Sequence, residues 1–477
     1  MIDRLVILGA TGDLSARYLL PALAALRANG DLGDRFELTG ASREDWDSER
    51  YRQWVTARLD RHGGDLPADA RAAVANATRY VRADVTSPGD LASAIAGEGP
   101  VALYLALPPA LFPVVITALH EAGLPEGSRI VLEKPFGENL ADAQGLNRLL
   151  AELVPEQAVF RVDHFLAMTT VQNVLGSRLA NRVLEPIWNS THIAEVDIVW
   201  NETLALEGRA GYYDTVGALK DMVQNHLLQL LCLVAMEPPV TLGERDLRDR
   251  KVDVLRSVRL LTEDDVVRRT RRGRYLAGRV QGRDIPAYAD EEGVDPRRRM
   301  ETYAEVELEL ESWRWSGTTF RLRSGKALGT DRKEVAVRFR SVPHLPFGHT
   351  GEPLPNVLRF GLEPESLTFD LTGIGAHPHT LAPLSLTAQM APPHLPAYGR
   401  LLLDVLNGDP SLSIRGDEAE EAWRVLTPVL DAWERDLVPL EEYPAGSEGL
   451  PPRPCGGGQQ RRGELLYAEA APPADAP

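Results

Sequence analysis

A histidine with a carboxylate beside it can move a proton, and this chain contains both residue types. His226 stands in the run Gln224-Asn225-His226, and Asp163 stands in the run Arg161-Val162-Asp163-His164. A neutral imidazole titrates near physiological pH and can accept a proton. A carboxylate bonded to it would fix its tautomer and stabilise the imidazolium. By itself, however, a histidine inside the apolar helical run Asp214–Met236 is more often structural than catalytic.

A glycine-containing turn near the N-terminus could bind a dinucleotide. The apolar strand Leu5–Leu8 runs into Gly9-Ala10-Thr11-Gly12-Asp13-Leu14, and a helical pattern follows. A tight glycine turn lets the backbone approach a pyrophosphate, and the helix N-terminus supplies N–H groups and the positive end of a dipole. The Gly9-x-x-Gly12 spacing is shorter than the usual fingerprint, so an ordinary strand-to-helix turn is the alternative.

The end of the second predicted strand bears on which dinucleotide would bind. An acidic residue there suits the ribose 2′-hydroxyl of NAD, whereas an arginine suits the 2′-phosphate of NADP. Here the strand Phe36–Gly40 is followed by Ala41-Ser42-Arg43, and both Ser42 and Arg43 can donate to a phosphate. The pattern favours NADP and leaves NAD possible. A solvated arginine in a charged loop is the alternative.

The elements around these residues predict a Rossmann domain over residues 1–165. Strand and helix patterns alternate there, which indicates a doubly wound parallel sheet. The predicted strands are Leu5–Leu8, Phe36–Gly40, Tyr80–Ala83, Val101–Leu107 and Arg129–Leu132, and the predicted helices are Tyr18–Asn29 and Asp47–Leu59.

Residues 166–443 have a different character and predict an α+β domain. Asp214–Met236 reads as one long, largely buried helix. Period-two alternation indicates a large, mostly antiparallel sheet that packs on helices. It is found in Val306–Leu310, Phe320–Leu322, Val335–Phe339 and Leu367–Leu371. Helical patterns return at Tyr398–Leu406 and Asp417–Trp433, and the Gly- and Pro-rich residues 444–477 are expected to be a disordered tail.

Composition narrows the classes of partner. The 477 residues carry a formal net charge of −17, so nucleic acid and anionic membranes are not expected as partners. Any anionic ligand must therefore be held by a local basic site. The two cysteines, Cys232 and Cys455, exclude a disulfide framework and a four-cysteine zinc site, and we expect no metal.

No targeting or membrane segment is expected. The N-terminus enters a strand without a charged leader, so we expect no signal peptide. Val101–Leu119 carries no charge and imitates a membrane span, but Pro108, Pro109 and Pro113 interrupt it. The chain is therefore expected to be cytoplasmic.

Ordered motifs along the chain resemble the glucose-6-phosphate dehydrogenase family. The resemblance begins at the glycine loop and continues to about Tyr443. Its motifs include Tyr104-Leu105-Ala106-Leu107-Pro108-Pro109, Glu133-Lys134-Pro135-Phe136-Gly137, Arg161-Val162-Asp163-His164-Phe165-Leu166, Glu207-Gly208-Arg209-Ala210-Gly211-Tyr212-Tyr213-Asp214, Gln224-Asn225-His226-Leu227-Leu228-Gln229 and Arg323-Ser324-Gly325-Lys326-Ala327-Leu328.

The resemblance implies oxidation of the C1 hydroxyl of a hexopyranose 6-phosphate to a lactone, with hydride passed to NAD(P). It implies that His226 is the general base and that Asp163 is its carboxylate partner. It further implies a homodimer or homotetramer assembled through the broad sheet. Whether the Lys134–Pro135 bond is cis or trans cannot be read from the sequence.

The resemblance also implies two sets of binding residues. The cofactor set is Gly9, Thr11, Gly12, Asp13, Leu14, Ser42, Arg43, Leu107, Pro108 and Lys134. The substrate set is Lys134, His164, Phe165, Met168, Glu202, Asp214, Lys326, Arg332 and Glu363, with Arg332 offset by one residue from the family position.

Three of these positions depart from the family. The family's phosphate-binding run Asp-His-Tyr-Leu-Gly-Lys-Glu reads Asp163-His164-Phe165-Leu166-Ala167-Met168-Thr169 here, and Glu363 stands where the family has glutamine. Each charge-assisted hydrogen bond contributes roughly 1.5–3 kcal/mol, so the losses could weaken a phosphorylated substrate by ~10²- to 10⁴-fold. The family's lysines after the glycine loop are also replaced, by Ala16, Arg17 and Tyr18.

Several functions therefore stay open at the level of sequence. The enzyme could use glucose 6-phosphate with reduced affinity, or an unphosphorylated or amino-bearing hexose. A non-catalytic relative that binds the cofactor would tolerate the altered phosphate run. It would have no chemical reason to keep His226, Asp163 and Lys134 together. An unrelated Rossmann reductase is disfavoured because the ordered motifs extend through Lys326.

Overall fold

The computed structural model describes residues 1–346, 353–375, 380–390 and 393–451. The chain divides into two compact units, each built from separate stretches of sequence. The first unit comprises Met1–Ser177, Gln224–Leu260 and Ala391–Asp431, and the second comprises Arg178–Val223, Leu261–Met390 and Ala432–Pro477.

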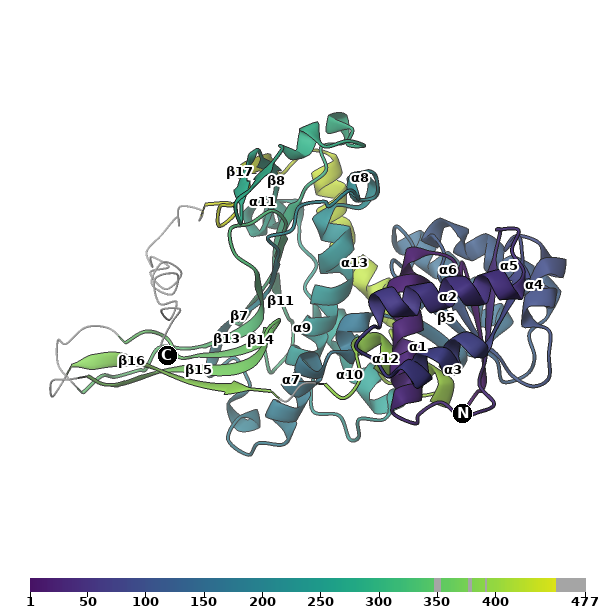
Figure 1. Cartoon of the computed structure of the whole chain (residues 1–477). Coiled ribbons are helices and arrows are strands. Elements are labelled where there is room, and N and C mark those ends of the chain that lie inside the picture. The colour runs from purple at the N-terminus through teal and green to yellow at the C-terminus, as the bar shows by residue number, and fades with distance from the viewer. Residues whose placement is uncertain (347–352, 376–379, 391–392, 452–477) are drawn as a thin grey trace. The chain divides into compact units, whose positions relative to one another are not determined.

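A six-stranded parallel sheet forms the centre of the first unit (Figure 1). Its strand order is β3-β2-β1-β4-β5-β6, which reverses direction between β1 and β4. The strands are β1 (Arg4–Leu8), β2 (Glu37–Ser42), β3 (Thr78–Arg82), β4 (Ala102–Leu105), β5 (Arg129–Glu133) and β6 (Val159–Val162). Because every pairing is parallel, the sequence-based prediction of a doubly wound Rossmann sheet is confirmed.

The helices of the first unit come from distant parts of the chain. They include η1 (Ser15–Leu19), α1 (Leu20–Ala28), α2 (Ser48–His62), α3 (Ala68–Asn76), α4 (Pro88–Ile95), α5 (Phe112–Ala122), α6 (Leu140–Leu153), α7 (Thr169–Leu179), α9 (Leu228–Ala235), α10 (Glu244–Ser257), α12 (Ala397–Asn407) and α13 (Gly416–Glu434). Polar side chains cap the first turns of some of these helices, such as Asp47 for α2 and Ser87 for α4. Leu402, Val405 and Leu406 of α12 join the same core as α1 and β1, beside which α12 lies in Figure 1.

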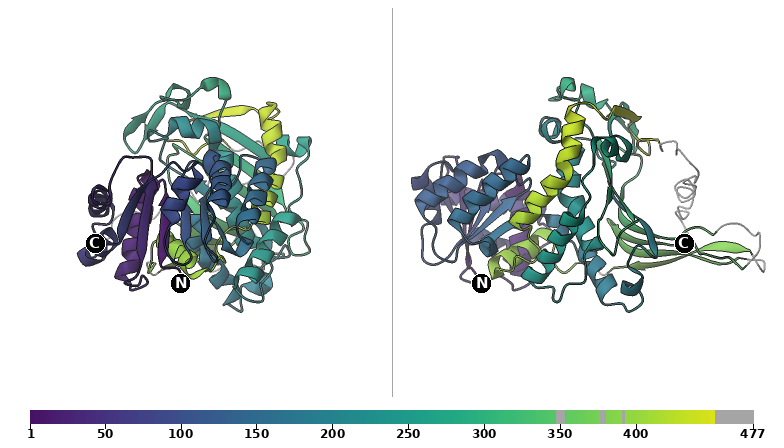
Figure 2. Two further views of the ribbon diagram at one scale, coloured as in Figure 1. Left: turned by 90° about the vertical axis from the view of Figure 1, so that its right-hand side faces the viewer. Right: turned by 180° about the vertical axis from the view of Figure 1, so that it is seen from behind.

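A nine-stranded mixed sheet forms the second unit. Its order is β16-β15-β14-β13-β7-β12-β11-β8-β17, and the views in Figure 2 show its green strands from other sides. The strands are β7 (Ile193–Asn201), β8 (Thr270–Leu276), β11 (Tyr303–Glu309), β12 (Thr319–Gly325), β13 (Arg332–Phe339), β14 (Val357–Leu362), β15 (Glu365–Ile374), β16 (Leu381–Gln389) and β17 (Leu440–Pro444). The pairs β7–β12 and β8–β17 are parallel and the other pairs are antiparallel, which confirms a mostly antiparallel sheet.

The smaller elements complete the second unit. They are α8 (Ala210–Ala218), α11 (Glu263–Arg269) and the hairpin of β9 (Gly278–Val280) and β10 (Arg283–Ile285).

The prediction of one continuous helix over Asp214–Met236 is wrong. Helix α8 ends at Ala218, a π-helix η6 (Leu219–Leu227) follows, and α9 begins at Leu228. The break lies at Gly217, whose φ of 69° and ψ of 171° are not helical. A Cβ atom at this position would lie 2.5 Å from Glu301 Oε1, so the close approach requires glycine.

The prediction of a disordered tail over residues 444–477 is tested only in part, because the described residues end at Pro451. Residues 440–444 form β17, and the description continues to Pro451. Residues 452–477 of the predicted disordered tail lie outside the described residues. In the part of the chain that the structure describes, no helix has the length and apolarity needed to cross a membrane.

Candidate active site

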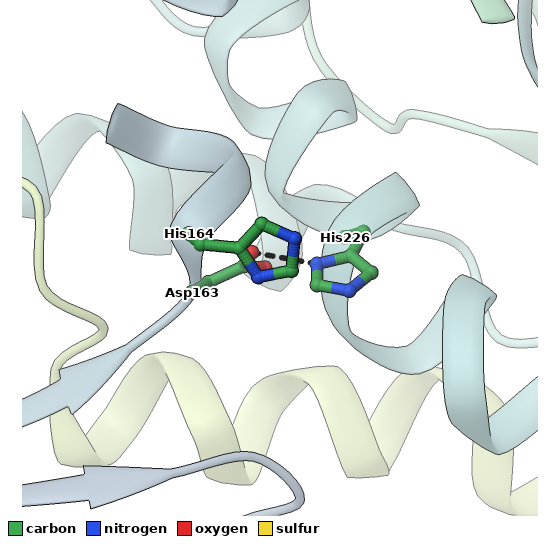
Figure 3. Close-up of side chains that lie close together, drawn as sticks. All are labelled: Asp163, His164 and His226. Atoms are coloured by element: carbon green, nitrogen blue, oxygen red, sulfur yellow. Dashed lines mark hydrogen bonds and ion pairs between the residues drawn. The ribbon is translucent and has the colours of Figure 1, made fainter. Parts of the chain in front are cut away.

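The dyad of Asp163 and His226 is formed as the sequence predicts (Figure 3). Asp163 follows β6 and caps the short 3₁₀ helix η4 (His164–Ala167), while His226 lies near the end of η6. Their atoms Nδ1 and Oδ1 are 2.6 Å apart, although the residues are separated by 63 positions in sequence. The N–H of Phe165 donates to the same Oδ1 at 3.0 Å, so the carboxylate is held from two sides.

The electrostatics of the dyad keep its carboxyl group ionised. Burial by itself would raise the pKa of Asp163, but the adjacent His226, His164 and the N–H of Phe165 overcome this effect and lower the pKa to about 2. Both side chains of the dyad are almost completely buried. A buried, ionised acceptor at Nδ1 is the arrangement that leaves Nε2 of a neutral imidazole as the proton acceptor.

Aromatic rings surround the imidazole of His226. Phe165 stacks on it face to face, with ring centroids 3.8 Å apart and an angle of 7° between the planes. His164 meets it edge-on at 5.1 Å and itself stacks on Tyr398 of α12 at 5.6 Å. Tyr398 in turn packs against Tyr18 at 5.2 Å. These contacts restrict the rotation of the His226 imidazole ring.

Asp163, His164 and His226 are also residue types that bind metals. One potential ligand atom from each lies within 4.8 Å of the others. The Nδ1–Oδ1 distance of 2.6 Å is that of a hydrogen bond and leaves no room for an ion between these two atoms. The arrangement therefore fits a proton-transfer dyad better than a metal centre.

A second acidic group lies at the end of β5. Tyr104 O–H donates to Glu133 Oε1 at 2.5 Å. Burial raises the pKa of Glu133 to about 7, against the opposing effects of that hydrogen bond and the positive charge of Lys134. The next peptide bond, Lys134–Pro135, is cis, which answers the question that the sequence left open.

The glycine loop has the shape that a dinucleotide turn requires. Gly9 has a φ of 81°, and a Cβ atom there would lie 2.3 Å from the carbonyl oxygen of Ala106. Gly12 N–H donates to Gly9 O at 3.0 Å, which closes the turn before Asp13 and Leu14. The positive φ and the close approach to Ala106 therefore require glycine at position 9.

The other residues that the sequence predicts to bind the cofactor are Ser42, Arg43, Leu107, Pro108 and Lys134. The Thr11 hydroxyl donates to Glu44 Oε1 at 2.9 Å and lies 3.2 Å from the hydroxyl of Ser42. Ser42 is buried at the end of β2, and Arg43 is exposed just beyond it. Leu107 and Pro108 follow β4, the strand next to β1. Glu44 was missed by sequence reasoning, and its position directly after Arg43 was the available signal.

Four of the five predicted substrate residues in the second unit form ion pairs of 2.6–2.7 Å. Lys326 Nζ donates to Glu202 Oε2 at 2.6 Å, and the same ammonium lies 5.4 Å from the ring centre of Tyr213. Arg332 pairs with Glu334 at 2.7 Å. Glu363 precedes a cis proline and pairs with Lys333 at 2.6 Å. Lys326 and Glu202 thus form a polar pair beside an aromatic ring, a combination suited to a sugar.

The prediction that Asp214 binds the substrate requires a correction. Its side chain is completely buried, and both oxygens already accept hydrogen bonds. Oδ1 accepts from the Tyr288 hydroxyl at 2.8 Å, and Oδ2 accepts from Asp295 N–H at 2.9 Å and from Arg298 at 3.2 Å. This carboxylate ties the loop that follows η7 (Tyr288–Asp290) to α8, so its surroundings indicate a structural role in place of sugar binding.

Asp221 is a carboxylate of η6 that the predicted substrate set does not include. It lies five residues before His226 in η6, and π-helical hydrogen bonding links residues five apart. The spacing of five residues between Asp221 and His226 is visible in the sequence. In the α-helix that the sequence predicts, however, residues five apart lie on different faces.

The remaining predicted residues are distributed as follows. The first unit brings Lys134, Asp163, His164, Phe165, Met168 and His226 into one body together with the glycine loop. Met168 is partly exposed after η4, and Phe165 is buried. Glu202, Asp214, Lys326, Arg332 and Glu363 belong to the second unit.

Two family models together match almost the whole described chain. The model described as "Glucose-6-phosphate dehydrogenase, NAD binding domain" matches residues 6–173. The model described as "Glucose-6-phosphate dehydrogenase, C-terminal domain" matches residues 175–453.

Individual relatives agree with the family models. The chain is 40% identical to a glucose-6-phosphate 1-dehydrogenase of Treponema pallidum, over 93% of this chain and 91% of the relative. It is 41% identical to the enzyme of that name from Mycolicibacterium smegmatis, over 93% of each chain.

Solved structures show the same likeness. A glucose-6-phosphate 1-dehydrogenase from Mycobacterium avium superimposes with a TM-score of 0.83 at 33% identity, over 94% of this chain and 95% of that one. A glucose-6-phosphate dehydrogenase in complex with its substrate glucose-6-phosphate gives 0.84 at 29% identity over 99% of both chains. With the dyad and the glycine loop in place, these matches show that the chain belongs to the glucose-6-phosphate dehydrogenase family.

Proposed function

We propose that this protein oxidises the C1 hydroxyl of a hexose 6-phosphate, or of a hexose, to the lactone with NADP as the hydride acceptor. The reaction is that of a glucose-6-phosphate 1-dehydrogenase. The observation that carries the proposal is the 2.6 Å contact between His226 Nδ1 and the ionised, buried Asp163. Relatives that bear this name cover the same length of chain.

The dyad supplies the proton acceptor for the reaction. Asp163 accepts the Nδ1–H of His226, so the lone pair of Nε2 is available for the C1 hydroxyl proton. As the hydroxyl loses its proton, the positive charge that develops on the imidazole is stabilised by the carboxylate. Bound NADP would supply the acceptor for the hydride that leaves C1. His226 keeps its orientation because Phe165 stacks on its face.

The first unit has the residues that would hold the cofactor. Gly9, Thr11, Gly12, Asp13 and Leu14 form a turn at the start of a helix, where backbone N–H groups favour a pyrophosphate. Ser42 and Arg43 would bind the 2′-phosphate, and Leu107, Pro108 and Lys134 follow neighbouring strands of the sheet. Glu44 favours the 2′-hydroxyl of NAD by its charge, so use of both cofactors is expected.

The residues proposed to bind the substrate are found in each unit separately. Lys134 and His164 belong to the first unit, and Glu202, Lys326 and Arg332 to the second. Asp221 is added to this set as a carboxylate close in sequence to the base. Carboxylates and ammonium groups bind sugar hydroxyls through charge-assisted hydrogen bonds.

Recognition of the 6-phosphate is proposed to be weak. The family's lysine and tyrosine are Met168 and Phe165, and Phe165 packs on the base. Lys333 pairs with Glu363, and Arg332 pairs with Glu334. These two cations of the second unit therefore already have acidic partners. An unphosphorylated or amino-bearing hexose is the alternative substrate that this distribution of charge favours.

A comparison of substrates tests the proposal. Initial rates with NADP and NAD would be measured for glucose 6-phosphate, glucose and glucosamine, with lactone formation checked by product analysis. His226→Asn should abolish every activity while cofactor binding persists. A chain that reduces neither cofactor with any hexose would contradict the proposed reaction. A low-micromolar KM for glucose 6-phosphate would contradict only the weak recognition of phosphate.

We further propose which segment binds each ligand and that the chain forms an oligomer. Residues 1–165 would bind NADP, and residues 166–443 would bind substrate and mediate a homodimer or homotetramer in the cytoplasm. Exposed apolar side chains on the outer strands support the assembly, since Ile374, Leu384 and Leu386 are each about half exposed or more. Light scattering coupled to size exclusion would measure the oligomer, and a monomer at micromolar concentration would contradict it.

A further inference from the structure

A basic cavity lies in the first unit beside the glycine loop. Its volume is about 430 Å³. It is formed by the loop, by η1 and by the C-terminal half of α2, and its lining residues are Thr11, Gly12, Asp13, Ala16, Arg17, Trp54, Arg58, Arg61 and His62. We call this space the α2 cavity. None of the residues proposed above for the 2′-phosphate, Ser42 and Arg43, lines it.

Two of the three arginines that line the α2 cavity, Arg58 and Arg61, have no acidic partner among the described residues. Within residues 1–346 and the other described ranges, the side chains of Arg58 and Arg61 form no ion pair and no hydrogen bond. Arg58 lies over the ring of Trp54 at 5.3 Å, and its Nε is buried without an acceptor. Arg17 approaches Asp13 at 3.4 Å, but both side chains are more than half exposed. The lining thus presents three guanidinium groups against one carboxylate.

Two nearby arginines outside the cavity do have acidic partners. Arg52 of α2 pairs with Glu49 at 2.6 Å, and Arg71 of α3 pairs with Asp60. In a chain with a net charge of −17, acidic side chains are abundant, so a group of arginines left without them is unusual. Unpaired cations that converge on a concave space indicate an anionic ligand.

The chemistry of the lining indicates phosphate. Guanidinium groups present paired N–H donors that match phosphate oxygens, and they bind them in a bidentate manner. The loop residues Thr11–Asp13 also line the cavity, so it lies next to the backbone expected to hold a pyrophosphate. Ala16 and Tyr18 stand where the family has lysines after the glycine loop. Arg58 and Arg61 of α2 supply positive charge beside the same loop.

We propose that the α2 cavity is a second phosphate subsite, in which Arg58 and Arg61 hold a phosphate group of a phosphorylated ligand. The phosphate could belong to the dinucleotide or to a separate anion such as a polyphosphate, and the chemistry is the same in both cases. The version with the dinucleotide rests on the proposed function, whereas the version with a separate anion does not.

Direct binding measurements test the subsite without any need for catalysis. The wild type, Arg58→Ala, Arg61→Ala and the double variant would be titrated with NADP, NAD and inorganic pyrophosphate by calorimetry. Arg52→Ala is the matched control, since it removes an equal charge from α2 outside the cavity. Loss of each arginine–phosphate contact should raise a Kd by about tenfold. Thermal melts and the Arg→Lys variants, which retain the charge, separate lost binding from lost folding.

The three titrations distinguish the source of the phosphate. A Kd that rises for NADP alone assigns the 2′-phosphate, and equal rises for NADP and NAD assign the pyrophosphate bridge. A rise confined to inorganic pyrophosphate assigns a separate anion. If all three Kd values of the double variant stay within twofold of those of Arg52→Ala, the subsite does not exist. Failure of sugar oxidation would leave each of these results unchanged, so it would count against the proposed function only.

Discussion

At the residue scale, the hydrogen bond between Asp163 and His226 determines which nitrogen of the imidazole can act as a base. The carboxylate is buried, ionised and held by the N–H of Phe165, so it has little freedom to turn away from Nδ1. Phe165 contacts the dyad twice, since its N–H bonds to the aspartate and its ring covers the histidine. Phenylalanine in place of the family's tyrosine lacks the hydroxyl, but it makes both of these contacts with the dyad.

Asp163→Asn should lower kcat between about 10²- and 10⁴-fold, because an amide neither fixes the productive tautomer nor stabilises the imidazolium. The Kd for NADP should change less than threefold, since the dyad is not part of the glycine loop. Steady-state rates and a fluorescence titration with NADPH would measure the two quantities. A kcat within threefold of the wild type would show that Asp163 does not support the base.

At the element scale, the break between α8 and η6 gives His226 its place. Gly217 passes close to Glu301, whose carboxylate accepts the N–H of Leu219 at 3.0 Å. The π-helical turn starts there and ends with His226 and Leu227. A regular α-helix through Gly217 would rotate every later side chain, including the imidazole.

Gly217→Ala should destabilise the protein by about 2–4 kcal/mol. The added Cβ would lie 2.5 Å from both Glu301 Oε1 and Met300 Sδ, in a backbone conformation that only glycine adopts readily. Gly211→Ala is the matched control in the same helix, since the nearest atom to its Cβ is 3.9 Å away. Thermal melts would compare the two variants, and equal melting temperatures would contradict the role given to Gly217.

The elements also show what could and could not be predicted from the sequence. The parallel sheet and the pairing of His226 with Asp163 followed from local patterns and ordered motifs. The break at Gly217 could not be seen, because the helical pattern of the run Asp214–Met236 continues on both sides of it and the cause lies 84 residues away at Glu301. The burial of Asp214 was missed for the same reason, as its partners Tyr288 and Asp295 are far along the chain.

At the scale of the whole molecule, the stability should depend on pH through Glu133. Burial raises the pKa of Glu133 to about 7 from 4.5, so the folded state favours the protonated carboxyl. This contribution is fully present below pH 4.5 and is lost as the pH rises through 7. It amounts to about 3 kcal/mol at most.

Glu133→Gln should remove that part of the pH dependence. Urea unfolding at pH 5.5 and pH 8.5 would give the loss of stability in the wild type and in the variant. The variant should lose about 2 kcal/mol less, because its amide does not ionise and part of the effect is already lost at pH 5.5, one unit above the ordinary pKa of 4.5. Glu301, whose pKa is also raised to about 7 by burial, is present in both proteins and cancels in the difference. Identical losses in the two proteins would contradict a raised pKa at Glu133.

The first unit is assembled from three separate stretches of chain, and the last of them carries α12. Leu402, Val405 and Leu406 complete the apolar core around α1, and Ile2 N–H donates to Leu406 O at 2.7 Å. A ribosome must therefore release more than four hundred residues before the earliest ones can find their final neighbours. Nascent chains halted before Ala397 would leave that face of α1 uncovered and open to chaperones or proteases.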